Sequence, residues 1–173
     1  MGKIIFITGG ARSGKSALAV EIAKEISGGR VAFVATCRPQ DAEMKIRVIA
    51  HRKKRPASWR TIEASDDLLK ALKKVTPRFK VAIVDCLTLF VSGLLMKGAE
   101  EREIVNGIRA IAAALAKAPH TTIIVSNEVG SGVVPENRLG REFRDAAGLA
   151  NQIMAESAEE AYFVVARIPL KLK

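Results

Sequence analysis

One segment near the N-terminus constrains the fold of this chain more than any other. Residues 9–16 read GGARSGKS, which satisfies the pattern G-x-x-x-x-G-K-[ST]. The segment follows the apolar run Ile4–Ile7 and precedes a helical pattern over Ser16–Ile26, the context that a phosphate-binding loop needs. Glycine residues let backbone N–H groups turn toward a phosphate, and the following helix adds its positive N-terminal end. The segment therefore predicts a nucleotide-binding loop between a strand and a helix.

The residues of this loop have distinct expected roles. Lys15 is expected to contact the β- and γ-phosphates and so to take part in catalysis, and the Ser16 hydroxyl is expected to ligate Mg²⁺. An ordinary glycine-rich turn is the alternative, and the strand and helix on either side argue against it. The candidate nucleotide-binding residues of the loop are Gly9, Gly10, Ala11, Arg12, Ser13, Gly14, Lys15 and Ser16.

Short β-branched or aromatic runs alternate with longer helical patterns along the chain. Such alternation indicates βαβ units, so the expected fold class is α/β, with a mostly parallel central sheet and helices on both faces. The sequence shows no linker, internal repeat or low-complexity tract, so residues 1–173 are expected to form a single P-loop nucleotide-binding domain. The predicted strands are Lys3–Thr8, Val31–Ala35, Val81–Asp85, Thr121–Ser126 and Ala161–Val165.

Helical periodicity and end signals predict the helices. Gly28-Gly29 is expected to end the first helix, and Asp66 and Asp67 favour the N-terminus of the third. The last helix is expected to turn one stripe toward the core, formed by Leu139, Phe143, Ala147, Ala150, Ile153 and Met154. The predicted helices are Ser16–Ile26, one that starts near Asp41, Ser65–Val75, Glu100–Ala118 and Glu136–Ala158.

Charge and cysteine usage narrow the class of protein. The chain has 28 Lys and Arg residues against 18 Asp and Glu residues, and the net charge of +10 favours anionic partners such as nucleotides, nucleic acid or anionic lipid. Cys37 and Cys86 have no metal-ligand spacing, so neither a disulfide framework nor a structural zinc site is predicted.

The N-terminal apolar run is too short for a signal peptide, and the run Val81–Met96 is interrupted by Asp85 and falls short of a membrane span. A cytoplasmic protein without a membrane span is expected.

A carboxylate ends the third predicted strand. Asp85 follows the run Val81–Val84, where a parallel strand would place it beside the phosphate loop, and it resembles a Walker B acid. Its expected role is to hold Mg²⁺ directly or through water, together with Ser16. A polar strand end is the alternative, and the phosphate loop favours the functional interpretation. The turn-rich segment Asn127–Pro135 follows the fourth strand, where α/β sheets bind ligands.

A basic segment between Arg38 and Arg60 holds one of the two histidines. It contributes +6 of the net charge, enough to neutralise a triphosphate, to steer an anionic substrate or to bind nucleic-acid backbone. A solvated helix face is the alternative. The imidazole of His51 can act as a base, bind a metal or attack phosphorus, or it can be structural. His120 is expected to be a loop residue.

Taken together, these motifs occur in an order that is far more specific than the phosphate loop alone. They are Gly9–Ser16, Ala35-Thr36, Arg47…His51…Arg55-Pro56, Trp59-Arg60-Thr61, Glu63, Asp85-Cys86-Leu87-Thr88, Ser126–Gly130, Val134–Arg138, Phe143-Arg144-Asp145 and Asn151-Gln152. This set resembles the bifunctional adenosylcobinamide kinase / adenosylcobinamide-phosphate guanylyltransferase family, and the resemblance spans the first strand to the C-terminus. It implies a RecA-like P-loop fold and a homotrimer with active sites at subunit contacts.

The resemblance also implies two reactions. A nucleoside triphosphate, ATP or GTP, gives its γ-phosphoryl group to a hydroxyl of adenosylcobinamide. A histidine then takes GMP from GTP and passes it to adenosylcobinamide phosphate, which gives adenosylcobinamide-GDP. His51 matches the guanylylated histidine, so the implied catalytic residues are His51, Lys15 and Asp85. The further nucleotide contacts implied are Ala35, Thr36, Cys37, Arg52, Arg55, Glu63 and Asp85.

Three positions depart from the family pattern. Arg167 stands where glycine is more frequent, Gly93 replaces a usual asparagine, and Phe90 occupies a position that is often tryptophan. These departures bear on substrate contacts and on the backbone turn near Arg167.

Other P-loop classes compete with this interpretation. A GTPase switch would need an N-K-x-D segment, and Asn127–Gly130 lacks its lysine and aspartate. A nucleic-acid-dependent P-loop ATPase would suit the basic segment, but only 5% of the residues are aromatic and no stacking pattern is present, so no nucleic-acid partner is expected. A monofunctional P-loop small-molecule kinase would share the fold and use Lys15, Ser16 and Asp85 while His51 is structural.

Overall fold

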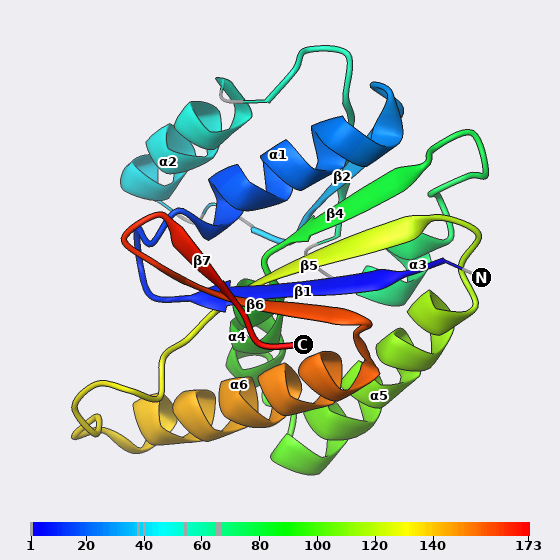
Figure 1. Ribbon diagram of the computed structural model, residues 1–173. Coiled ribbons are helices and arrows are strands. Elements are labelled where there is room, and N and C mark those ends of the chain that lie inside the picture. Colours follow the sequence, from blue (N-terminus) through cyan, green and yellow to red (C-terminus); the bar gives the residue numbers. More distant parts are fainter. Residues whose placement is uncertain (1, 38, 40, 54, 65–66) are drawn as a thin grey trace.

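The computed structural model describes residues 2–37, 39, 41–53, 55–64 and 67–173 of the chain (Figure 1). Arg38, Ser65 and Asp66, which are named above, and Lys54 of the basic segment lie outside the described residues. The strands are β1 Ile4–Gly9, β2 Val31–Ala35, β3 Arg60–Glu63, β4 Val81–Asp85, β5 Thr121–Asn127, β6 Glu160–Val165 and β7 Ile168–Lys171. The helices are α1 Lys15–Ser27, α2 Ala42–Lys53, α3 Leu68–Leu72, α4 Leu87–Met96, α5 Glu101–Ala116 and α6 Arg138–Ser157.

The strands of the described chain form one sheet in the order β3-β2-β4-β5-β1-β6-β7. Every neighbouring pair is parallel except β6 and β7, which form an antiparallel hairpin at the edge. β5 therefore lies between β1, which leads into the phosphate loop, and β4, which ends at Asp85. Because the central strands are parallel, their carboxyl ends meet at one edge of the sheet, where α/β proteins bind ligands.

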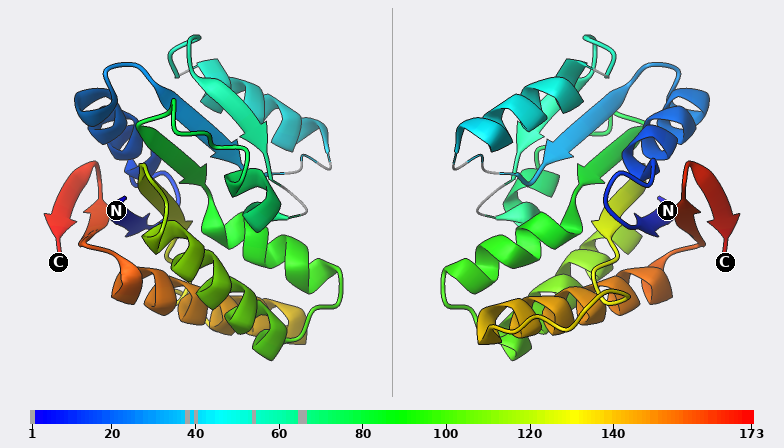
Figure 2. Two further views of the ribbon diagram at one scale, coloured as in Figure 1. Left: turned by 90° about the vertical axis from the view of Figure 1, so that its right-hand side faces the viewer. Right: turned by 90° about the vertical axis from the view of Figure 1, so that its left-hand side faces the viewer.

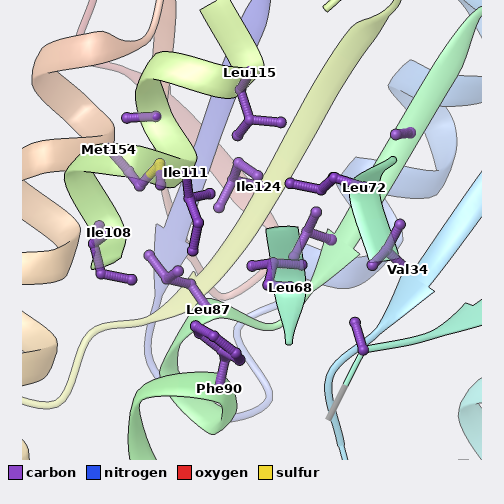
Figure 3. Packing of buried hydrophobic residues seen from close by; sticks show 14 of the residues in the cluster. Val34, Leu68, Leu72, Leu87, Phe90, Ile108, Ile111, Leu115, Ile124 and Met154 are labelled. Carbon is purple, nitrogen blue, oxygen red and sulfur yellow. The ribbon is translucent and has the colours of Figure 1, made fainter. Parts of the chain in front are cut away.

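Two apolar cores cover the two faces of the sheet. On one face, alternate strand residues such as Phe6, Val84 and Ile124 pack against α3, α4, α5 and α6 (Figure 3). On the other face, residues such as Ile7 and Ile83 pack against α1. Figures 1 and 2 show α1 and α2 on one side of the sheet and α4, α5 and α6 on the other. The predicted arrangement of helices on both faces is confirmed.

The ends of several helices follow the expected local chemistry. α1 ends at Gly28, whose φ of 57° is the left-handed conformation that glycine adopts without a steric penalty. Asp67 caps α3 by accepting a hydrogen bond of 2.9 Å from the backbone N of Lys70. Asn137 caps α6 in the same way, with a bond of 2.7 Å from the backbone N of Gly140. These caps position the helices that flank the carboxyl edge.

The structure adds three elements that the sequence patterns did not predict. β3 contains a single buried side chain, Ile62, and β7 is an exposed edge strand that contains Pro169, so neither shows an apolar run. α4 is apolar almost throughout and shows no amphipathic period. The helix predicted over Ser65–Val75 is also shorter, since α3 spans five residues.

The core stripe predicted for the last helix is wrong at its first position. Leu139 is 54% exposed, because it lies in the first turn of α6, beyond the edge of the sheet. Ala147, Ala150 and Met154 are buried as predicted. The sheet therefore supports the middle and the end of α6 and leaves its start free.

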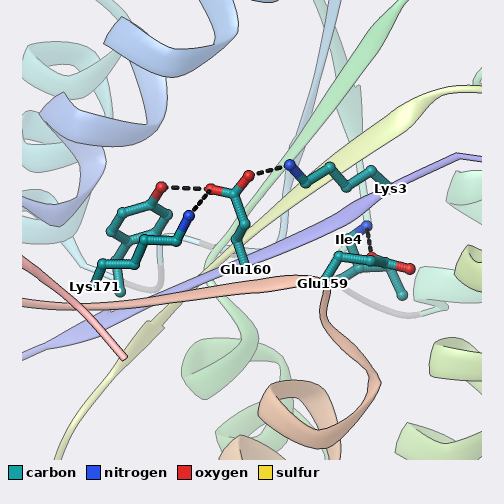
Figure 4. A network of polar contacts seen from close by, with 6 residues as sticks. Lys3, Ile4, Glu159, Glu160 and Lys171 are labelled. Carbon is teal, nitrogen blue, oxygen red and sulfur yellow. Dashed lines mark hydrogen bonds and ion pairs between the residues drawn. The ribbon is translucent and has the colours of Figure 1, made fainter. Parts of the chain in front are cut away.

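A polar network joins the strands at the amino-terminal ends of β1 and β6, opposite the carboxyl edge (Figure 4). The carboxylate of Glu160 accepts hydrogen bonds from the amine of Lys3 and the hydroxyl of Tyr162, and Lys171 Nζ lies 3.6 Å from Glu160 Oε2. The hydrogen bonds from Lys3 and Tyr162 lower the pKa of Glu160 to about 2. The bond between Tyr162 and Glu160 also raises the pKa of Tyr162 to about 12. The network links the start of β1 to β6 and β7.

Candidate active site

The phosphate loop lies between β1 and α1, as its sequence predicts. Lys15 is only 7% exposed, and its Nζ donates a 2.9 Å hydrogen bond to the carbonyl oxygen of Gly10. Burial lowers the pKa of Lys15, while the charge of Asp85 acts in the opposite direction. Gly14 has a φ of 104°, which favours glycine, and α1 begins directly after it. The loop thus presents the N-terminus of α1 and a buried lysine at the carboxyl edge of β1.

The β6–β7 hairpin supports the loop from outside. The backbone N of Arg167 donates a 2.7 Å hydrogen bond to the carbonyl oxygen of Ser13. A Cβ added to Gly14 would lie 2.9 Å from Cγ of Arg167, so only glycine fits between the loop and the hairpin. Arg167 has a φ of 69° and Ala166 a φ of 49°, both in the region that favours glycine. Glycine adopts a positive φ without strain, which agrees with the glycine that the resemblance led us to expect at position 167.

Asp85 occupies the position that was predicted for it, at the end of β4. Burial raises the pKa of Asp85; a hydrogen bond from Ser16 and the charges of His51, Lys15 and Arg55 lower it. The contact between Ser16 and Asp85 brings two hard oxygen ligands together beside the loop, which is the chemistry that Mg²⁺ prefers. Within the described residues no group of three or more His, Cys, Asp and Glu side chains is placed to hold a metal ion. A cation at Ser16 and Asp85 would therefore need phosphate oxygens or water to complete its shell.

His51 lies in the last turn of α2 and is exposed to solvent. Arg55 follows the helix, and its Nε donates a 3.3 Å hydrogen bond to the carbonyl oxygen of His51. The guanidinium of Arg55 also lies over the ring of Phe33, with Cζ 3.6 Å from the ring centroid. Burial lowers the pKa of Arg55, and the charge of Asp85 raises it. Arg55 thereby connects the end of α2 to strand β2 and to Asp85.

The end of β2 forms the next part of the same edge. The hydroxyl of Thr36 donates a 2.7 Å hydrogen bond to the carbonyl oxygen of Cys86, so it is already used inside the protein. Burial raises the pKa of Cys37, and the charge of Asp85 raises it further. Ala35 pairs with Asp85 on one side and with Glu63 on the other.

The structure brings most of the predicted site residues together, but Glu63 lies apart from the phosphate loop. β3 is separated from β1 by β2, β4 and β5, which amounts to four strand spacings or roughly 19 Å. Glu63 and the loop therefore lie at opposite ends of the site. Arg52 is exposed near the end of α2, beside His51.

Sequence reasoning assigned no role to a set of buried polar groups behind the site. Thr88 and Ser126 are buried, and they are hydrogen-bonded to each other and to Asn127 and Asn151. The only signal for them was their presence in three motif segments, Asp85-Cys86-Leu87-Thr88, Ser126–Gly130 and Asn151-Gln152.

A parallel sheet, a phosphate loop after β1 and a carboxylate after β4 define a P-loop nucleotide-binding protein. A comparison with solved protein structures agrees with this class. The KaiC-like protein PH0186 from Pyrococcus horikoshii OT3 superposes with a TM-score of 0.56 at 18% identity, over 94% of this chain and 72% of that protein. This likeness confirms the predicted RecA-like fold.

Residues 5–172 match the family described as cobinamide kinase / cobinamide phosphate guanyltransferase. The bifunctional adenosylcobalamin biosynthesis protein CobP of Pseudomonas aeruginosa is 42% identical over 96% of this chain and 95% of that protein. The bifunctional adenosylcobalamin biosynthesis protein CobU of Escherichia coli is 38% identical over 98% of this chain and 99% of that protein. The chain therefore belongs to the cobinamide kinase / cobinamide phosphate guanyltransferase family, and it is a bifunctional transferase of cobalamin biosynthesis.

Family membership favours this class over a monofunctional kinase and over a nucleic-acid-dependent ATPase. Among the described residues, no helix has both the length and the apolar character needed to cross a membrane.

Proposed function

We propose that this protein phosphorylates adenosylcobinamide with ATP or GTP and then transfers GMP from GTP to adenosylcobinamide phosphate, with His51 carrying the guanylyl group. The observation that supports this proposal best is the convergence at one sheet edge of a buried loop lysine, a carboxylate and an exposed histidine. Lys15 and His51 both lie close enough to Asp85 to influence its pKa, so the three groups belong to one site. The description of the family gives the two activities, and the proposal adds the residues that perform them.

The kinase step uses the phosphate loop. Backbone N–H groups of residues 10–16 and the amine of Lys15 hold the β- and γ-phosphates at the N-terminus of α1. The substrate hydroxyl attacks the γ-phosphorus, the bond to the β-phosphate oxygen breaks, and the hydroxyl proton is lost to solvent or to a nearby base. Ser16 and Asp85 would hold Mg²⁺, which supplies neutralisation of the charge that develops on the phosphates.

The transfer step uses the end of α2. A neutral imidazole is nucleophilic near pH 7, so a ring nitrogen of His51 attacks the α-phosphorus of GTP and pyrophosphate leaves. A phosphate oxygen of adenosylcobinamide phosphate then attacks the same phosphorus, and the bond between phosphorus and the His51 nitrogen breaks. Arg52 and Arg55 lie beside His51 and are suited to stabilise the charge on the leaving and entering phosphates.

Covalent labelling tests the proposal. The purified protein is incubated with Mg²⁺ and GTP labelled at the α-phosphate, denatured, and assayed for acid-labile, base-stable label. The chain has only two histidines, so His51→Gln should abolish the label while His120→Gln, a change at a buried residue, should retain it. A folded His51→Gln protein that is labelled as strongly as the wild type would refute the role of His51.

We further propose that the protein is a cytoplasmic homotrimer with active sites at subunit contacts. Five large apolar side chains of the described residues are exposed near the carboxyl edge, and burial against a second copy would remove them from water: Ile46, Ile49, Val133, Val134 and Leu139. Light scattering coupled to size exclusion should give three times the chain mass of 18.6 kDa. A mass equal to that of one chain at assay concentration would contradict the trimer.

A further inference from the structure

Four polar residues form a closed ring of hydrogen bonds behind the phosphate loop. The backbone N of Asn127 donates to Oγ1 of Thr88 at 2.6 Å, and Thr88 Oγ1 lies 3.1 Å from Ser126 Oγ. Ser126 Oγ donates to Oδ1 of Asn151 at 2.6 Å, and Nδ2 of Asn151 donates to the carbonyl oxygen of Asn127 at 3.1 Å. The ring therefore starts and ends at the backbone of one residue, Asn127.

The direction of each bond in the ring follows from the number of protons. Ser126 has one hydroxyl proton and gives it to Asn151, so the bond between Thr88 and Ser126 has Thr88 as its donor. Each hydroxyl then donates once and accepts once. Asn151 must both accept and donate, which only an amide side chain of this length can do here. Thr88 and Ser126 are buried, so a broken ring would leave polar groups unpaired in the core.

The ring holds the carboxyl end of β5, which lies between the phosphate loop and the segment that contains Asp85. Asn127 is paired with Gly9, the first residue of the phosphate loop, and Glu128 N donates a 2.9 Å hydrogen bond to Gly9 O. Thr88 lies in the first turn of α4, three residues after Asp85. The ring thus connects the loop, through β5, to the segment that carries Asp85.

The side chain of Asn127 lies between these two parts. Among the described residues, its Nδ2 makes only a long contact of 3.8 Å with Sγ of Cys86, and a thiol is a weak acceptor. Asn127 is half-buried at the carboxyl end of β5, so its amide can donate to an oxygen that enters the site. Because β5 lies between β1 and β4, such an oxygen would lie between the phosphate loop and Asp85.

We propose that Asn127 contacts the transferred phosphoryl group and that Asn151, from α6 outside the site, is the positioning residue that holds Asn127 in place. This inference rests on the proposed roles of the phosphate loop and Asp85 in the kinase step. Asn151 acts through the backbone of Asn127, so its loss changes the rate of transfer more than the binding of the nucleotide.

Two substitutions of Asn151 separate positioning from general support of the fold. Asn151→Ala removes both bonds. Asn151→Asp keeps an oxygen to accept from Ser126 but places a second oxygen opposite the carbonyl of Asn127, where a donor is required. The matched control is Gln152→Ala, since Gln152 is the exposed neighbour on the same helix. Folding of each variant is checked by circular dichroism and urea titration before the assay.

The assay is phosphorylation of adenosylcobinamide, with kcat and the nucleotide KM measured separately. Both Asn151 variants should lower kcat by about 10- to 100-fold with little change in KM, and Gln152→Ala should match the wild type. Asn151→Asp is nearly isosteric, so it keeps the test valid if Asn151→Ala does not fold. The double variant Asn127→Ala/Asn151→Ala should have the same kcat as Asn127→Ala alone, because Asn151 acts through Asn127.

Several results would overturn the inference. A folded Asn151→Asp protein with the kcat of the control would show that the ring only supports the fold. A double variant whose loss equals the product of the two single losses would show that Asn151 does not act through Asn127. Lys15→Ala is assayed in parallel: if it is inactive and the Asn151 variants are normal, this inference alone fails. If Lys15→Ala retains turnover, the proposed function fails and the inference fails with it.

Discussion

Glu160 gives the sharpest stability prediction, because its network is the main polar connection between β1 and the edge hairpin (Figure 4). Glu160→Gln keeps the shape of the side chain and removes its charge. The neutral amide still accepts a hydrogen bond, but it no longer attracts Lys3 and Lys171. We expect the variant to fold and to be less stable than the wild type.

The size of the effect follows from the pKa and from the exposure of the partners. A pKa lowered from 4.5 to about 2 corresponds to an upper limit of roughly 3 kcal/mol, since one pKa unit is about 1.4 kcal/mol. The side chains of Lys3 and Lys171 are 42% and 58% exposed, so water and salt screen their attraction for Glu160. We therefore expect Glu160→Gln to lower the free energy of unfolding by about 1 kcal/mol near pH 7.

The sign of the pH dependence is fixed by the lowered pKa. The folded protein prefers the ionised carboxylate, so the stabilisation is complete above pH 4.5 and is lost as the pH falls from 4.5 toward 2. Urea titrations of the wild type and Glu160→Gln should differ near pH 7 and converge as the pH falls through that range. Glu25→Gln on the exposed surface of α1 serves as the control. A difference that is absent near pH 7, or that does not shrink in acid, would refute the reasoning.

Three further changes test the core, the loop and a buried imidazole. Met154→Ala removes a fully buried side chain and should cost about 2–5 kcal/mol in a urea titration; a loss below about 1 kcal/mol would contradict its place in the core. Gly14→Ala forces an alanine into a φ of 104° against Arg167, so it should cost about 1–3 kcal/mol and abolish binding of GTP in calorimetry, and normal binding would contradict the loop geometry. Burial lowers the pKa of His120 from 6.5, so the folded state excludes a proton and stability should fall as the pH drops below 6.5. His120→Gln should flatten that dependence below pH 6.5, and an unchanged slope would exclude His120 as its source.

Much of the fold could be predicted because its elements carry strong local signals. The strands 31–35 and 81–85 are continuous apolar runs, as expected for strands buried on both faces, and their predicted bounds match the structure. β3 and β7 were missed because an edge strand buries few side chains and therefore needs no apolar pattern. α4 was missed because it is apolar on all sides, so its sequence shows no helical period.

The sequence by itself determined the class of chemistry, because a phosphate loop is a local structure whose residues are adjacent in the chain. It also identified Asp85 as a strand-end carboxylate and His51 as a histidine within a basic segment. Only the tertiary structure decided that Arg167 supports the loop and that Asn151 closes a ring with Thr88, since these residues are far apart in the chain. Such contacts depend on strand order and register, which arise when the whole sheet packs, and no local pattern encodes them.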